Sequence, residues 1–164
     1  MVIVTPALAD ANNGNWRTAQ RWASMLRGRC DVRLAAAWHR GDESVMIALH
    51  ARRSAASVDA WRARYPARPL IVVLTGTDLY RDIATDAAAR HSLDIADLLV
   101  TLNTLGPRSL PQALQPRCRV VLQSCPSRVR LAAPARYLRA LMIGHLRDEK
   151  APDVLFDAVR ELAA

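Results

Sequence analysis

Short apolar runs alternate along the chain with stretches whose apolar residues recur at helical spacing, and this alternation predicts strands separated by helices. The runs that indicate strands cover six segments: 2–7, 31–38, 44–50, 69–75, 98–103 and 117–124. The helices are expected at 15–28, 54–65, 84–97 and 107–115. Strands that are apolar on both faces and joined through helices are typical of parallel sheets. We therefore expect an α/β domain with a doubly wound, mostly parallel, Rossmann-like sheet.

The regular alternation ends after residue 125. Residues 126–137 contain two prolines and no clear period, and we interpret them as a linker. A further strand is expected over 138–146, and Pro152 opens a last helix with apolar residues on one face. Because one strand and one helix do not make a domain, the sequence predicts a complete domain over 1–125 and the incomplete beginning of a second over 138–164.

The charge narrows the classes of partner. The 164 residues carry a formal net charge of +8, which would suit nucleic acid, but nearly all of the cations are scattered arginines and Lys150 is the only lysine. A basic cleft for a small anion explains the charge equally well, and we expect no nucleic-acid partner. No apolar run approaches the length of a membrane span and the N-terminus lacks a signal-peptide pattern, so we expect a cytoplasmic protein without a membrane partner.

The cysteines and histidines predict neither a disulfide nor a metal centre. The three cysteines include no CxxC pair, and the four histidines show no metal-ligand spacing. We therefore expect reduced thiols, no metal and no cofactor.

Polar residues gather where the predicted strands end, which is the edge of a doubly wound sheet at which ligands bind. Asn13, Gly14 and Asn15 precede the first helix, where Gly14 lets a ligand approach the backbone and the helix N-terminus attracts anions. A plain capped turn explains these three residues equally well. Asn103 ends the fifth strand and is a further candidate contact.

The segment after the third strand contains His50, Arg52, Arg53 and Ser54. Two adjacent arginines can clamp a phosphate, and a histidine can act as a general base or donate to an oxyanion. Ser54 can cap the following helix. Taken without other information, these residues favour the simpler interpretation, in which the arginines are solvated and His50 closes the edge of the sheet.

The segment after the fourth strand, TGTDLYRD, offers a second set of candidates. Gly76 permits an unusual backbone angle, the hydroxyls of Thr75 and Thr77 can contact a ligand, and Asp78 can accept from a sugar hydroxyl or cap a turn. Arg81 can pair with Asp78 or Asp82, or face an anion. A pocket and an ordinary turn explain this segment about equally well.

Four stretches, VIVTP (2–6), ALHARRSA (48–55), VLTGTDLYRD (73–82) and IGHLRDEKAP (143–152), together resemble the SenB-type selenosugar synthases, which are GT-B glycosyltransferases of family 4 type. The resemblance runs along the whole chain and covers the N-terminal half of such an enzyme. It implies a two-domain fold with the active site between the domains. It also implies transfer of a sugar from a UDP-sugar, UDP-GlcNAc or UDP-glucose, to selenophosphate on the way to selenoneine.

The resemblance assigns roles to individual residues. The N-terminal domain of such enzymes mainly holds the acceptor, which implies that Arg52 and Arg53 hold selenophosphate. His50 and Asp78 are the candidate catalytic residues, one of which would orient the acceptor. The pair that holds the donor diphosphate corresponds to Arg147 and Lys150, although His145 stands where the wider family has its arginine. The acidic motif that grips the donor has no counterpart before residue 164, so we expect this chain alone to bind a nucleotide sugar poorly and to turn over little.

Other functions stay open at this point. The chain can be a non-catalytic module, or a degenerate relative, that binds a phosphate-bearing or sugar ligand without transferring it. A nucleic-acid partner is the third interpretation, which the scattered arginines support weakly. The apolar face of the last helix needs a partner. Two alternatives stay open: the helix folds back on its own domain, or it packs against another copy and gives a homodimer through the C-terminal strand and helix.

Overall fold

The computed structural model of the chain describes residues 1–8, 13–127, 129–130, 132, 135–137, 139, 141–143 and 151–163. The chain divides into two units, 1–125 and 126–164, each of which is described by itself. The candidate residues from 13 to 103 all belong to the first unit.

Six strands form one sheet in the first unit. They are β1 (Val2–Val4), β2 (Arg33–Ala35), β3 (Met46–Leu49), β4 (Leu70–Leu74), β5 (Leu98–Thr101) and β6 (Cys118–Val120). The strand order is β2-β1-β3-β4-β5-β6, and each adjacent pair is parallel. The predicted fold class is confirmed, and the sheet is parallel throughout. Each strand is shorter than the segment predicted for it.

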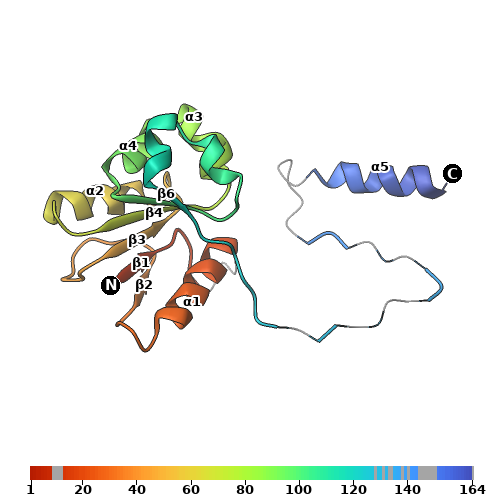
Figure 1. Ribbon diagram of the computed structural model, residues 1–164, viewed down its shortest axis with the longest axis horizontal. Coiled ribbons are helices and arrows are strands. Elements are labelled where there is room, and N and C mark those ends of the chain that lie inside the picture. The colour runs from red at the N-terminus through yellow and green to blue at the C-terminus, as the bar shows by residue number, and fades with distance from the viewer. Residues whose placement is uncertain are drawn as a thin grey trace. The chain divides into compact units, whose positions relative to one another are not determined.

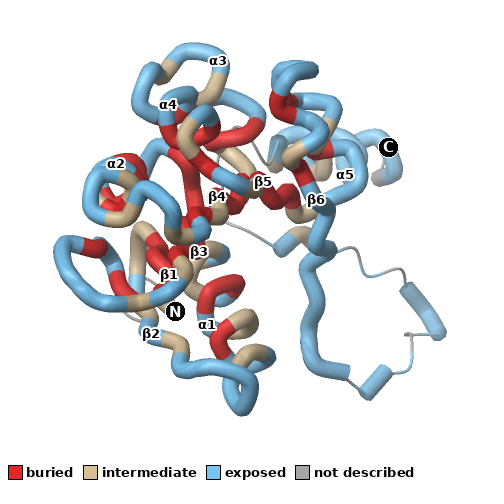
Figure 2. The backbone as a smooth tube through the Cα atoms, turned by 60° about the vertical axis from the view of Figure 1, so that its left-hand side comes forward, coloured by how far each residue is buried: buried red, intermediate tan, exposed pale blue. Residues whose placement is uncertain are grey.

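Helices cover both faces of this sheet (Figure 1). Side chains alternate between the faces along each strand. Helix α1 (Gly14–Leu26) packs Ala19 and Ala23 against one face, which carries Ile3, Ile47, Leu49, Val73 and Val100. Helices α2 (Ala55–Arg64) and α4 (Ala87–Ile95) pack against the other, which carries Val2, Val4, Met46, Ala48, Val72 and Leu74. Figure 2 shows the buried residues concentrated in the central strands, so the strand ends are held on a rigid base.

Helix α2 is anchored by an aromatic cluster. Trp61 is fully buried and its ring centroid lies 5.2 Å from that of Trp38 and 5.2 Å from that of Tyr65. The predicted apolar stripe of this helix is therefore its buried face. The helix begins differently from the prediction, because the Ser54 hydroxyl donates to the Leu49 carbonyl at 2.6 Å and makes no cap bond. Ser54 thus ties the start of α2 to the end of β3.

The segments after β4 and β5 contain short helices that the sequence pattern did not resolve. A π-helix, η2 (Asp78–Asp82), is followed by α3 (Ile83–Thr85), and α4 begins only after Asp86, whose side chain accepts from the Ala89 amide at 2.8 Å. The helix expected at 107–115 consists of two 3₁₀ segments, η3 (Gly106–Ser109) and η4 (Gln112–Arg117). Prolines without a backbone N–H keep this stretch from forming one α-helix.

The second unit contains helix α5 (Pro152–Ala163), which begins at the predicted proline. Its apolar side chains Val154, Phe156, Val159 and Leu162 are exposed. Of the strand predicted over 138–146, the structure describes residues 139 and 141–143, and these contain no strand. Among the described residues, no helix is long and apolar enough to cross a membrane.

Candidate functional site

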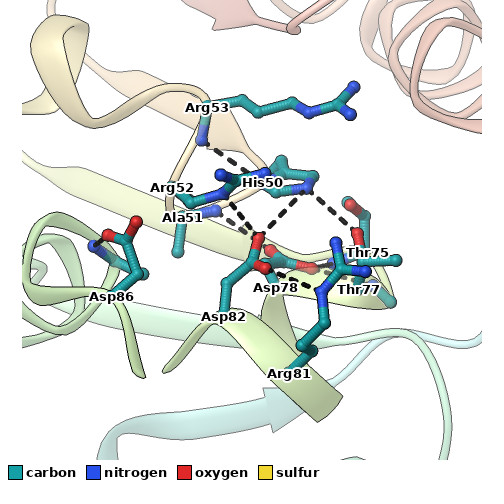
Figure 3. A network of polar contacts seen from close by, with 12 residues as sticks. His50, Ala51, Arg52, Arg53, Thr75, Thr77, Asp78, Arg81, Asp82 and Asp86 are labelled. Carbon is teal, nitrogen blue, oxygen red and sulfur yellow. Dashed lines mark hydrogen bonds and ion pairs between the residues drawn. The ribbon is translucent and has the colours of Figure 1, made fainter. Parts of the chain in front are cut away.

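The candidate site borders the point where the strand order of the sheet reverses, which lies between β1 and β3. The chain passes from β1 to β2 on one side of β1 and then returns to place β3 on its other side. The carboxyl ends of the strands at such a switch point leave a crevice between their loops. The loop after β3 begins with His50, and the neighbouring loop after β4 contains Thr75, Gly76 and Thr77. Figure 3 shows the side chains of the two loops facing one another.

His50 is held in an unusual backbone conformation directly after β3. Its φ is 73°, in the left-handed region, and its side chain is only 3 % exposed. Its amide donates to the Val73 carbonyl at 2.9 Å and its carbonyl accepts from the Ser54 amide at 3.0 Å. A non-glycine residue in this region costs free energy and persists where its surroundings fix it. The backbone of β4 and the start of α2 supply that constraint.

Both nitrogens of the His50 ring have partners. Nδ1 accepts from the Arg53 amide at 3.3 Å, and Nε2 lies 3.2 Å from the Thr77 hydroxyl oxygen. Burial lowers the pKa of His50 and Arg53 lowers it further; together with Arg52 they outweigh the opposing effect of Asp78 and Asp82. His50 is therefore neutral at pH 7. A ring with both nitrogens engaged has no lone pair free to take a proton from a ligand.

Asp78 joins the two loops through the backbone. One carboxylate oxygen accepts from the amides of Thr75 and Gly76, each at 2.9 Å, and the other accepts from the Ala51 amide at 2.9 Å. The residue is fully buried. Gly76 has a φ of 142°, which lets its amide turn toward this carboxylate. These contacts account for both oxygens of Asp78 and make it a structural anchor, so the predicted catalytic role gains no support from its geometry.

Asp82 is a buried carboxylate that the sequence did not single out as a site residue. It accepts from Arg52 Nε at 2.8 Å and from Arg81 Nε at 3.2 Å. Burial acts to raise its pKa, but these hydrogen bonds outweigh burial and hold the pKa below its ordinary value. Asp82 is therefore ionised at pH 7. The only sequence signal for it was its position next to Arg81, which was expected to pair with Asp78 or Asp82.

Arg53 differs from Arg52 and Arg81, the other two arginines of the cluster. Its side chain is exposed and, in the part of the chain that the structure describes, its guanidinium makes no hydrogen bond or ion pair. In Figure 3 it extends on the opposite side of the His50 ring from Asp82. Arg52 uses Nε for Asp82, and its side chain is 40 % exposed. The loop after β3 therefore presents cations beside a neutral imidazole.

The remaining predicted residues lie apart from this cluster or outside the described residues. Asn13 caps α1 by accepting from the Trp16 amide at 3.1 Å, so this segment contains the capped turn that was one of its two interpretations. Gly14 and Asn15 are the first residues of the helix. Asn103 is engaged in protein contacts, since its side-chain oxygen accepts from the amides of Leu105 and Gly106 and its side-chain amide donates to the Tyr80 hydroxyl at 2.9 Å. Arg147 and Lys150 lie outside the described residues.

Two further observations bear on ligands. Among the described residues, no group of three His, Cys, Asp or Glu side chains could hold a metal ion. A cavity of about 350 Å³ lies beside η2, and its lining is mainly apolar: Leu79, Tyr80, Ile83, Ala84, Ser109, Leu110 and Pro111. This cavity does not include the polar cluster, so its volume says nothing about the size of a ligand bound there.

Comparisons with known proteins assign the chain to no family. No family model matches it, and no curated protein matches it. Chemically, the cluster offers exposed guanidinium groups, a hydroxyl and no free base, which is a donor set for an anion.

Replacing Asp78 with asparagine should destabilise the protein. The side-chain amide of the Asp78→Asn variant would direct an N–H group toward a backbone N–H and leave at least one buried amide without an acceptor, which we expect to cost about 2–3 kcal/mol. Asp86→Asn is the matched control, because a single cap bond that asparagine makes equally well should change stability by less than about 0.5 kcal/mol. Urea unfolding followed by tryptophan fluorescence measures both. Equal effects of the two substitutions would contradict the anchoring role.

The lowered pKa of His50 predicts a pH dependence of stability. An unfolded histidine takes up a proton near pH 6.5, whereas folded His50 does so only at lower pH. The free energy of unfolding is therefore unaffected by the titration of His50 above about pH 6.5 and decreases as the pH falls from there toward the folded pKa, because the unfolded chain binds the proton first. We expect the free energy of unfolding to drop more between pH 7.5 and 5.5 in the wild type than in His50→Asn, since both retain the other histidines. Parallel pH profiles would show that His50 does not titrate in this way.

Proposed function

We propose that unit 1–125 binds a small phosphate-type anion at the loops after β3 and β4. The observation that carries this proposal is the Arg53 guanidinium, which is exposed and has no partner among the described residues, beside a neutral His50 at the end of β3, a strand that borders the switch point of the sheet. Guanidinium groups match the geometry of phosphate oxygens. The switch point is where doubly wound sheets bind their ligands.

The charge of the cluster agrees with an anionic ligand. Asp82 pairs with Arg52, and because His50 is neutral, the positive charge of Arg53 is not balanced by a carboxylate among the described residues. The Asp78 charge is also directed at backbone amides of the loops, away from the arginines. A small anion would neutralise the excess and pair with the Arg53 guanidinium.

The sequence resemblance extends this proposal to a reaction. We propose that the anion is selenophosphate and that the unit is the acceptor-side domain of a UDP-sugar-dependent glycosyltransferase that forms a selenosugar for selenoneine. The selenium atom would attack the anomeric carbon, the bond from that carbon to the UDP oxygen would break, and UDP would leave with the electron pair. The product would carry the phosphoryl group on selenium, and hydrolysis of the phosphorus–selenium bond by water would release phosphate and the selenosugar. Selenophosphate is already anionic and needs no general base. This suits a cluster in which His50 and Asp78 are fully engaged.

The same engagement of His50 and Asp78 also favours a second candidate, a binding module without transfer activity. Such a module would retain a phosphate-bearing ligand through Arg53 and Arg52 and would need no donor side. In the transferase, Arg147 and Lys150 would hold the donor diphosphate. Even slow release of UDP in the presence of UDP-GlcNAc or UDP-glucose with selenophosphate would identify the transferase, because the module would bind the anion and release no UDP.

Phosphate binding should depend on Arg53. At low ionic strength, where charge interactions are screened least, we expect Arg53→Gln to weaken binding of inorganic phosphate about tenfold, the effect of one lost charge-assisted hydrogen bond. Arg29→Gln removes the same charge from an exposed arginine near the amino-terminal edge of the sheet and should leave the affinity unchanged. Calorimetric titration measures both, and equal losses would indicate a nonspecific charge effect.

Competition between ligands should show whether the site binds the acceptor or the donor. Selenophosphate carries the same oxygens as phosphate, so we expect it to displace phosphate from the wild type, and UDP-GlcNAc to leave bound phosphate in place. Titration of the phosphate-loaded protein with each compound gives the answer. Displacement of phosphate by UDP-GlcNAc, and not by selenophosphate, would assign the loops to the donor and contradict an acceptor site.

A further inference from the structure

The two contacts of the His50 ring determine where its proton lies. A backbone N–H can only donate, so His50 Nδ1, 3.3 Å from the Arg53 amide, must be the unprotonated acceptor. A neutral imidazole carries one proton, which is therefore on Nε2. The nearest acceptor of that proton is the Thr77 hydroxyl oxygen at 3.2 Å, because Asp82 Oδ2 lies 3.9 Å from Nε2, too far for a hydrogen bond.

This assignment fixes the direction of the Thr77 hydroxyl. Its oxygen accepts from His50, so its own proton must point elsewhere. Among the described residues, no acceptor takes that proton, and the Thr77 side chain is partly accessible. The chain of donors runs from the Arg53 amide to His50 Nδ1 and from His50 Nε2–H to Thr77. It ends in a hydroxyl proton at the surface of the cluster.

We propose that His50 is a positioning residue that turns the Thr77 hydroxyl into an obligate donor to the bound anion. The proposal rests on the proposed function, since it names the contact that an oxygen of a phosphate-type group makes at this site. It also sets a specificity: the atom facing Thr77 must accept a hydrogen bond, which every unprotonated phosphate oxygen does and an ammonium group cannot. The role differs from proton transfer, because the ring keeps one tautomer throughout.

The left-handed conformation of His50 provides a substitution that isolates this role. Asparagine is well tolerated at positive φ, and its side-chain oxygen can accept from the Arg53 amide in place of Nδ1. His50→Asn therefore keeps the loop contact and loses only the donor to Thr77. Thr77→Val removes the hydroxyl at nearly constant shape, and Thr77→Ser retains it.

The first measurement needs no ligand. Nitrogen-15 NMR of the free wild-type protein at pH 7.5, with His50 assigned from the spectrum of His50→Asn, should show an unprotonated Nδ1 and a protonated Nε2. A protonated Nδ1 would overturn the proposal. That result would leave phosphate binding, and with it the proposed function, untouched.

The second measurement is titration with inorganic phosphate. We expect Thr77→Val to weaken binding about tenfold, Thr77→Ser to bind like the wild type, and His50→Asn to weaken binding severalfold with the fold retained. The double variant His50→Asn/Thr77→Val should bind like Thr77→Val alone, because His50 acts through that hydroxyl. Additive losses, or an unaffected Thr77→Val, would overturn the proposal.

A UDP titration of the same variants separates two sources of phosphate oxygens. If the hydroxyl serves the acceptor anion, the variants should weaken inorganic phosphate and leave UDP binding unchanged. Losses confined to UDP would overturn the assignment to the acceptor. Absence of any phosphate binding by the wild type would contradict the proposed function, whereas the ring nitrogen signals would still decide how His50 and Thr77 are oriented.

Discussion

The arrangement of the site depends on one buried carboxylate. Asp78 accepts hydrogen bonds from three backbone amides, one in the loop after β3 and two in the loop after β4. A buried charge is tolerated only where hydrogen bonds replace the water it has lost, so the two loops must come together around it. The amide of Ala51 is one peptide from His50. The anchor therefore fixes the histidine ring and, through it, the neighbouring Arg53 and Thr77.

The cations are arranged by the second carboxylate. Asp82 holds the Nε atoms of Arg52 and Arg81 on one side of the cluster, while Arg53 extends from the other side of the His50 ring. The two aspartates of the DLYRD segment, Asp78 and Asp82, thus have different structural roles. One is satisfied by backbone and determines shape, and the other is satisfied by side chains and determines how much positive charge is left for a ligand. This division leaves His50 as a hydrogen-bonding group and not as a base.

Local patterns predicted the fold well and the site only in part. The alternation of apolar runs and helical stretches gave the parallel α/β sheet, because strands buried on both faces need no long-range information to be recognised. It also placed polar residues at the edge of the sheet where the carboxyl ends of the strands meet. The roles of the two aspartates were not predictable, since they depend on the pairing of Leu49 with Val73, which sets one loop opposite the other. The π-helix and the Ser54 contact with Leu49 likewise depend on tertiary packing.

All of these contacts arise within one β-α-β unit that runs from the start of β3 to Asp82. Asp78 and Ala51 are 27 residues apart in the chain, and the helix between them is packed on the two strands that it connects. The proposed anion site is therefore carried by a single contiguous segment. Such a segment can be duplicated, exchanged or inserted by one genetic event without separating its parts, so the loops of the proposed site and the remainder of the sheet can evolve at different rates.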